Sequence, residues 1–494
     1  MNRYDVFINS QRESLWRPAA GIVILFLSGC AAVGPDYAPP ETNPPAAWAT
    51  ELQSGLTDTR IDDPRMLANW WITLNDRTLS SLIERAVVGS VDMQVARARV
   101  REARARRGMS EADRFPTLTA GGSASRKRSS KEAGSGATTE LYNAGFDASW
   151  ELDVFGGVRR AVEAADAELQ ASEEDLRDVL ISLIAEVALN YVELRTFQTR
   201  LYVAKENLKS QEETYHITQW RHQAGMITEL DVDQARFNLD QLRSDIPSLY
   251  TGLEQAKNRI AVLLGRQPGA LSVLLDERKS IPLTPLEIGV GLPAEALRRR
   301  PDVRRAERQL AAQTARIGVA TAASYPDFSL AGSIGLESLM LGNLFTAGAK
   351  TASIAGNVGW TLFDAGRIRE NIEVKTALQE QLLKQYEATV LAALEDVENA
   401  LLAYVNEQAR RHALINGSQA AQRAVALALH EYDSGLVDFQ VVLDAQRSSL
   451  SLQNQLAISE GELTSNLIRL YKALGGGWES QQPAVTQPER MIQD

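Results

Sequence analysis

The sequence has one cysteine, Cys30, among its 494 residues, so no disulfide bond can form within a chain. It has few histidines, and they are scattered along two long helical stretches without metal-ligand spacing: His216, His222, His412 and His430. It also lacks a Gly-rich phosphate loop and a nucleophile elbow, so we expect no catalytic residue, no metal and no enzyme. A net charge of −11 argues against nucleic acid as a partner. No apolar run reaches the roughly 18 residues of a membrane-spanning helix, so such a chain would cross a membrane only with strands.

The amino terminus has the pattern of an export signal. Three arginines precede a short apolar run at 19–27, and the run ends in Leu27-Ser28-Gly29-Cys30. This resembles a bacterial lipoprotein signal, with residues 1–29 removed and Cys30 as the first, lipid-bearing residue. The alternative is a chance free thiol in a hydrophobic leader. Ala31 follows in place of the aspartate that commonly retains such proteins at the inner membrane, which favours the outer membrane.

Four segments alternate between apolar and small or polar residues. The clearest is 142–153, in which Phe146 and Trp150 belong to one face and Asp147 to the other. A period of two is typical of a strand with one apolar and one polar face. The predicted strands are residues 117–125, 142–153, 328–336 and 351–363.

Between the strands the sequence predicts unusually long helices. No proline interrupts 157–222, which as a helix would be roughly 100 Å long. The predicted helices are 79–113, 157–222, 228–264, 294–322, 366–432 and 437–474. In the last one, seven-residue spacing of buried-type residues such as Leu443, Leu450 and Ala457 predicts coiled-coil packing.

The second half of the chain repeats the first at a constant offset in residue number. Trp150 corresponds to Trp360, Gly225 to Gly435 and Ala235 to Ala445, each at an offset of 210. A constant offset across strands and helices indicates an internal duplication. The expected organisation is signal peptide 1–29, tether and equatorial segment 30–78, repeat one 79–265, connector 266–293, repeat two 294–475 and tail 476–494. Trp48, Trp70 and Trp71 are expected to dock the tether on the protein.

Four strands cannot close into a membrane barrel, because the smallest such barrels need about eight. An open sheet edge facing lipid is not viable, so the strands would have to be pooled between subunits. The alternative is a soluble sandwich with its apolar faces inward.

These segments together resemble one family. The residues that carry the resemblance are Leu27–Cys30, Trp150–Gly156, Leu362–Arg367, Tyr432–Gly435 and Leu443–Arg447. They are similar to those of outer membrane factors, the TolC- and OprM-like channels, and in particular to the NodT-like lipoprotein branch of RND-type efflux channels. The resemblance implies a mixed α+β membrane protein. A homotrimer would form one 12-stranded outer-membrane β-barrel, continued by a long α-helical coiled-coil barrel in the periplasm.

The resemblance also implies an aperture at the far periplasmic end of the helices. Asp444 matches an aperture aspartate and Tyr432 a tip tyrosine of the family. Three copies of Asp444 would form a cation-attracting ring; alternatively, Asp444 is an acid that is favourable near a helix amino terminus. Gln440 occupies a position that is often leucine in the lipoprotein branch, which argues against an apolar plug at this level of the aperture. Val441 is only a weak apolar substitute for that leucine.

The remaining expected sites are structural or contact surfaces. Gly225-Met226 and Gly435-Leu436 fit tight left-handed helix turns, at which the family's adaptor proteins dock. Phe155-Gly156 and Gly366 are the expected hinges where strand becomes helix.

Implied partners are a periplasmic adaptor, an inner-membrane RND-type or ABC pump and outer membrane lipid. The implied function is the passive exit duct of a tripartite efflux system. The alternatives are a type I protein secretion channel and a structural coiled-coil lipoprotein without a pore. Drug, aromatic-compound and metal export and protein secretion all remain open as cargo.

Overall fold

The computed structural model describes residues 32–41, 43–53, 55–57, 64–282, 285 and 288–478. These residues form two compact units. Unit 1 contains the described residues up to 41 together with 100–172 and 305–387, and unit 2 contains the remainder. Each unit therefore combines pieces of both predicted repeats. Four helices have residues in both units: α4 Val91–Ala112, α5 Gly157–Gln223, α9 Pro301–Ala322 and α10 Arg367–Asp433.

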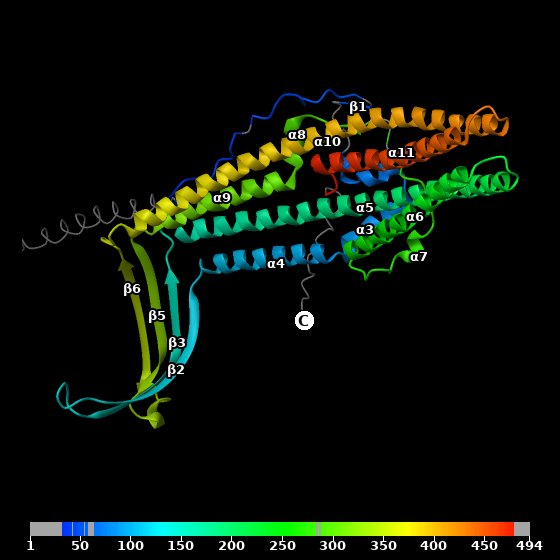
Figure 1. Ribbon diagram of the computed structural model, residues 1–494. Coiled ribbons are helices and arrows are strands. Elements are labelled where there is room, and N and C mark those ends of the chain that lie inside the picture. The colour runs from blue at the N-terminus through cyan, green and yellow to red at the C-terminus, as the bar shows by residue number, and fades with distance from the viewer. Residues whose placement is uncertain are drawn as a thin grey trace, which may run out of the picture. The chain divides into compact units, whose positions relative to one another are not determined.

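Unit 1 contains a four-stranded antiparallel sheet with the order β2-β3-β5-β6 (Figure 1). The strands are β2 Thr117–Arg128, β3 Thr138–Glu151, β5 Asp327–Ser338 and β6 Lys350–Gly359. Two short 3-10 helices, Leu341–Asn343 and Ala347–Ala349, lie between β5 and β6. All four predicted strands are present, but their ends differ from the prediction.

The differences at the strand ends follow from pairing. β2 and β3 continue their ladder out to the pair Arg128–Thr138, so β2 ends later and β3 begins earlier than predicted. β6 ends at Gly359 because its partner strand begins with Asp327 opposite it. The prediction of strand to residue 363 was wrong, since residues 360–363 have no ladder partner in the described chain.

The register places the apolar parities of all four strands on one face. Phe146 lies opposite Ile334, Ala148 opposite Gly332, and Leu118 opposite Ala148. The large apolar residues of this face are exposed in the single chain, among them Leu118, Phe146, Ile334, Ile354 and Val358. The other face carries serine, threonine, asparagine and Asp147, with Ser333 Oγ and Ser353 Oγ 2.7 Å apart. The predicted division into an apolar and a polar face is confirmed.

The strand-to-helix corners are fixed by aromatic residues. Trp150 donates its indole N–H to the Arg114 carbonyl at 3.0 Å, and Trp360 donates to the Ser324 carbonyl at 3.2 Å. The bond of the first corner therefore recurs at the equivalent positions of the second repeat. In the first corner Phe155 stacks on Tyr325 with ring centroids 4.7 Å apart.

The chain that follows the expected lipid site is held against unit 1. Val33 donates its amide to the Phe155 carbonyl at 3.0 Å. The buried Arg160 side chain donates to the carbonyls of Val33 and Gly34 and, at 2.7 Å, to the Asp36 carboxylate. The expected tether is therefore docked along its first described residues, because one buried guanidinium binds three of their acceptors.

Unit 2 contains the remaining elements. They are β1 Leu56–Thr57, α2 Pro64–Ala68, a 3-10 helix Trp70–Leu74, α3 Arg77–Gly89, α6 Glu229–Leu263, α7 Ser272–Leu275, β4 Ile288–Gly289, α8 Pro293–Arg299 and α11 Phe439–Ala473. Trp70 and Trp71 are buried, Trp70 stacks on Tyr471 at 5.4 Å, and Trp48 donates to the Gly291 carbonyl at 2.8 Å. The expected docking by these tryptophans is confirmed.

Two predicted helices are broken at equivalent positions of the two repeats. The helix expected at 79–113 divides at Ser90, and the helix expected at 294–322 divides at Arg300. Pro301 explains the second break, because the residue before a proline disfavours helical backbone. At the first break, a Cβ on Gly265 would clash with the Gly89 carbonyl oxygen. The glycine that ends α6 thus packs directly on the break.

Close helix packing in unit 2 depends on glycine at one position and not at another. A Cβ on Gly461 of α11 would clash with Thr196 Oγ1, whereas a Cβ on Gly417 of α10 would meet only Leu452 at 3.7 Å. We expect Gly461→Ala to lower the free energy of unfolding by about 1–3 kcal/mol through overpacking. The matched variant Gly417→Ala should instead raise it by about 0.5–1 kcal/mol, because alanine is the better helix former. Thermal unfolding followed by circular dichroism checks both, and equal shifts would contradict the close contact.

Candidate functional site

The two pairs of long helices reverse direction at turns with the same backbone geometry. Gly225 has φ +75° and Gly435 has φ +71°, the left-handed conformation that the sequence predicts. The amide of the following residue, Met226 or Leu436, donates to a carbonyl five residues earlier at 2.9 Å, as is typical of helices ended by glycine. Met226 and Leu436 are each 75% exposed. Each turn therefore presents one apolar side chain at its tip.

An arginine connects the two helix pairs beside these turns. Arg221, near the end of α5, makes an ion pair with Asp433 of α10 at 2.8 Å. Its guanidinium also lies 4.5 Å from the ring centroid of Tyr432. The arginine thus makes an ion pair and a cation–π contact with consecutive residues of the other helix pair.

A small apolar cluster packs against Tyr432, one of the two residues that Arg221 contacts. Its buried members come from α6, α10 and α11: Ala235, Ala428, Phe439, Val442 and Leu443. The Tyr432 ring packs against Phe439 at 5.3 Å, and its hydroxyl is buried without a hydrogen-bond partner among the described residues. Tyr432 is therefore held by the contacts of its ring with Phe439 and Arg221.

The aperture residues expected on α11 share an exposed surface of this helix. Gln440 donates its amide to Asp444 Oδ1 at 3.0 Å, and Val441 is exposed beside it. Arg447 approaches the same Asp444 oxygen at 3.6 Å and donates to Asn238 of α6 at 2.9 Å. The Asp444 carboxylate therefore has one polar neighbour a turn before it and one cation a turn after it, and it remains accessible to solvent.

The expected hinge residues lie in unit 1, directly before the long helices α5 and α10, whereas the turns follow these helices. Gly156 has φ +83°, and a Cβ there would come within 2.5 Å of Ala32 Cβ, so the docked amino-terminal segment requires this glycine. Gly366 has φ +90° and follows Ala365, which has φ 55°. Cys30, the expected lipid site, lies outside the described residues.

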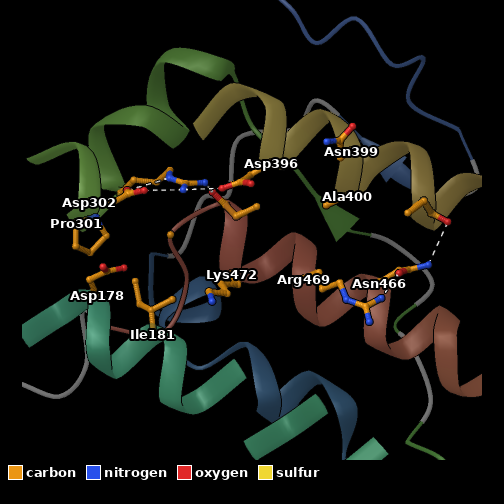
Figure 2. A pocket seen from close by; sticks show the side chains of 14 residues that line it. Asp178, Ile181, Pro301, Asp302, Asp396, Asn399, Ala400, Asn466, Arg469 and Lys472 are labelled. Carbon is orange, nitrogen blue, oxygen red and sulfur yellow. Dashed lines mark hydrogen bonds and ion pairs between the residues drawn. The ribbon is translucent and has the colours of Figure 1, made fainter. Parts of the chain in front are cut away.

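A cavity of about 420 Å³ in unit 2 is lined by charged side chains (Figure 2). Arg300 binds Asp302 at 2.7 Å, Asp396 at 2.9 Å and the Ala473 carbonyl at 3.1 Å. Burial opposes its charge, but hydrogen bonds and the charges of Asp302 and Asp396 outweigh burial and raise the pKa of Arg300. This arginine ties the break between α8 and α9 to α10 and α11.

No group of three or more His, Cys, Asp or Glu side chains among the described residues is arranged to hold a metal ion. None of the helices in the described part of the chain combines the length and hydropathy needed to cross a membrane.

Comparison with known proteins identifies the family. The model of the outer membrane efflux protein family matches residues 82–266 and 292–476, and the two segments begin and end at equivalent positions of the two repeats. The chain belongs to the outer membrane efflux protein family. It is 33% identical over 464 residues to the cation efflux system protein CusC of Escherichia coli O6:H1, covering 92% of this chain and 98% of CusC.

Other relatives agree with this assignment. Nodulation protein T of Rhizobium leguminosarum bv. trifolii is 32% identical over 92% of this chain and 96% of its own. Among solved structures, the outer-membrane channel OprN matches with a TM-score of 0.85 and 37% identity, covering 91% of this chain and all of that one. The prediction of an outer membrane efflux channel of the NodT-like kind, with a large periplasmic part, is confirmed. This family is not enzymatic, as the sequence predicted.

Sequence reasoning missed the polar residues that connect the helix pairs of this efflux protein. Arg221 was not singled out, and Asp433 and Gln446 were quoted only as parts of family motifs, without a role. Gln446 donates to Thr214 of α5 at 3.0 Å in a buried position. A basic residue in the last turn of α5 is explained equally well by the helix dipole. The sequence offers no local signal that this cation meets a carboxylate on a helix of the other repeat.

Proposed function

We propose that this efflux protein forms a homotrimer whose twelve strands close one outer-membrane barrel, continued by a barrel of helices in the periplasm. The trimer acts as the passive exit duct of a tripartite efflux system. The supporting observation is the sheet of unit 1, which exposes large apolar side chains on one face and small polar ones on the other. Exposed apolar strand faces fit lipid, and the polar face fits a wet lumen.

The free edges of the sheet support assembly from several copies. The outer edges of β2 and β6 have no ladder partner in the described chain. In lipid, unpaired edge amides and carbonyls are costly, so only a closed ring of strands is viable. Pooling four strands from each of three subunits satisfies both edges.

The aperture of the proposed duct lies at the helix turns. Three copies of Asp444 would surround the axis, with Gln440 and Val441 on the same exposed surface of α11 and Tyr432 behind them. Opening would separate the two helix pairs of a subunit, like the leaves of an iris. The connection from Arg221 to Tyr432 and Asp433 is then a contact that opposes opening.

The proposed partners follow from one surface in each unit. Met226 and Leu436, at the tips formed by Gly225 and Gly435, are the proposed contact points of a periplasmic adaptor, which would recruit an inner-membrane pump of the RND type. In the segment that precedes unit 1, we propose that Cys30 carries lipid. Val33, three residues later, is already bonded to the Phe155 carbonyl beside the sheet, which supports an anchor at the membrane surface.

The proposed duct is tested by electrical recording in planar lipid bilayers. The wild-type trimer should conduct ions weakly, and Asp444→Ala should conduct more and prefer cations less. The reason is that the substitution removes the charge and most of the side-chain volume of a carboxylate ring at the proposed aperture.

The matched control is Asp233→Ala, which removes an exposed carboxylate at a similar depth on α6. It should leave conductance and ion preference unchanged. Absence of conductance in both the wild type and Asp444→Ala would contradict the duct. Equal effects of the two substitutions would contradict the placement of Asp444 at the aperture.

A further inference from the structure

The charged residues on the apolar face of the sheet gather at one end. On this face, which carries Phe146 and Ile334, the four strands place four charged residues. They are Arg126, Arg128, Glu140 and Lys350. All of them lie toward the β2–β3 and β5–β6 connections, away from the end at which the strands join the helices (Figure 1). At the end that joins the helices, this face of the described strands carries no charge.

Within the described strands, only one of the three cations on this face is balanced. Arg126 Nε lies 3.5 Å from Glu140 Oε1, and the other oxygen of Glu140 accepts the Tyr142 hydroxyl at 3.2 Å. Arg128 and Lys350 are exposed, and neither has an ion-pair partner among the described residues. The charge of these two residues is therefore left for solvent or a ligand to balance.

A hollow of about 840 Å³ lies beside Lys350, on the strands β3, β5 and β6. On the apolar face it is lined by Ala144, Phe146, Ile334, Leu336, Ala352 and one charged residue, Lys350. The polar-face side chains of Asp147 and Ser333 do not line it, so it opens on the apolar face. The two alanines leave space between larger apolar walls. The hollow thus combines an apolar floor with a single cation at the first residue of β6.

The connection that leads into Lys350 is apolar as well. Its large apolar side chains are between 60% and 81% exposed: Leu339, Met340, Leu341 and Phe345. Exposed apolar surface of this kind marks a site of contact with a partner or a membrane. A cation beside such surface is stable in lipid only when water or an anion reaches it. The surroundings of Lys350 therefore match a ligand that has both an apolar chain and an anionic group.

We propose that the hollow binds an acyl chain of a phosphorylated glycolipid of the lipid A type, whose phosphate binds the Lys350 ammonium. The inference rests on the proposed function, in which the apolar face meets the lipid of the outer membrane, and it adds the class of lipid that this face binds.

The distribution of charge favours this lipid. With the helices in the periplasm, the strand connections lie in the leaflet that faces away from it, and that leaflet of an outer membrane consists of phosphorylated glycolipid. The unbalanced cations of the apolar face occur only toward this leaflet, where Arg128 meets the headgroups of neighbouring lipids. The leaflet of ordinary phospholipid borders the uncharged end of the face.

Burial of an acyl chain alone would not select one lipid, because lipid tails surround the barrel in any case. Selection comes from two contacts that ordinary neighbours of the barrel lack. A chain that fills the hollow gains close contact with Phe146 and Ile334. The phosphate gains a charge-assisted hydrogen bond from Lys350, which has no competing carboxylate among the described residues.

Lipid binding by the purified full-length protein tests the site. Delipidated protein in detergent is titrated with synthetic hexa-acylated lipid A, and native mass spectrometry counts the lipids retained. Lys350→Gln should bind lipid A about 10-fold more weakly, because it removes a hydrogen bond from a charged donor. Lys127→Gln is the matched control, since it removes an exposed lysine of the polar face at the same end of the sheet, and it should bind like the wild type.

A second pair of variants tests the hollow without changing charge. Ala144→Leu fills the space between the walls and should lower the number of lipids retained, whereas Ala148→Leu, on the same strand and face but outside the lining, should not. Dephosphorylated lipid A should bind the wild type as weakly as lipid A binds Lys350→Gln.

The outcomes that would overturn the site differ from those that would overturn the duct. Equal binding of lipid A and phosphatidylglycerol would overturn the glycolipid, and displacement of lipid A by inorganic phosphate would overturn the acyl site. Equal effects within either pair of variants would overturn the placement at Lys350 or in the hollow. Each of these results is compatible with a trimer that conducts. A protein that stays monomeric by native mass spectrometry and does not conduct would overturn the proposed function itself.

Discussion

Replacing Asp76 with alanine should lower the free energy of unfolding by about 2–5 kcal/mol, because it removes the cap of α3 and the acceptor of the Tyr191 hydroxyl, which links this carboxylate to a buried arginine. Asp76 caps α3 by accepting from the amides of Thr78 and Leu79 at 2.8 and 3.0 Å. Its other oxygen accepts the Tyr191 hydroxyl at 2.7 Å. Tyr191 in turn accepts from Arg195 at 2.9 Å. One side chain thus serves a helix cap and a charged network together.

The size of the effect follows from the surroundings of Arg195. This guanidinium is fully buried, and its other hydrogen-bond partners among the described residues are neutral: the Gln198 side chain and the Glu277 carbonyl. Burial, together with the hydrogen bond to Asp76, raises the pKa of Tyr191 to about 12. The phenol therefore stays protonated, so it donates to Asp76 while it accepts from Arg195. Without Asp76 the buried cation keeps no carboxylate in this network.

Thermal and urea unfolding at equal protein concentration, followed by circular dichroism, measures the loss. Asp92→Ala is the control, since it removes an exposed carboxylate from the first turn of α4. It should cost only about 0.3–1 kcal/mol through the helix dipole. A loss in Asp76→Ala no larger than in Asp92→Ala would show that Arg195 is balanced elsewhere.

Replacing Arg221 with alanine should raise the conductance of the proposed channel. Arg221 contributes a half-exposed ion pair to Asp433 and a cation–π contact to Tyr432, together about 1–2 kcal/mol. If the contacts exist only in the closed aperture, their loss in a single subunit shifts the equilibrium between closed and open about 5- to 30-fold. Single-channel recording should show a higher open probability than in the wild type.

A second arginine gives a matched control for this experiment. Arg243 of α6 binds Glu212 of α5 at 2.8 Å, the same distance as the Arg221–Asp433 pair, but within one helix pair. Arg243→Ala should therefore leave gating unchanged. Equal effects of the two substitutions, or none from Arg221→Ala, would mean that the connection between helix pairs does not hold the aperture.

The strands and turns could be predicted because their signals are local. Alternation around Phe146 and Trp150 gave the strand and its two faces, and glycine at 225 and 435 gave the left-handed turns. Because the sequence repeats, each of these predictions also applied to the equivalent residues of the other half. The break at Arg300 could also have been predicted from Pro301, although the predicted helix 294–322 runs through it.

Other features depend on contacts between distant residues. The break at Ser90 has no proline, and the close packing of Gly89 against Gly265 is not visible in either segment alone. Arg160 is an ordinary helix residue in the sequence, yet its side chain holds the segment around Asp36. The connection from Arg221 to Asp433 requires knowing that the two helix pairs lie side by side. These are tertiary effects on residues whose local sequence is ordinary for a helix.

The internal duplication constrains sequence change more strongly in the sheet than at the helix turns. In the sheet both hairpins keep one register, so a shift in one strand must be matched in the others. At the turns the copies have diverged: the counterparts of Arg221 and Asp433 are Glu431 and Gln223, and the counterpart of Asp444 is Gln234. The two halves of the chain have kept the same strand pairing in the sheet. At the helix turns their sequences have diverged. Inherited variation at the helix turns can therefore alter one helix pair and leave its twin unchanged.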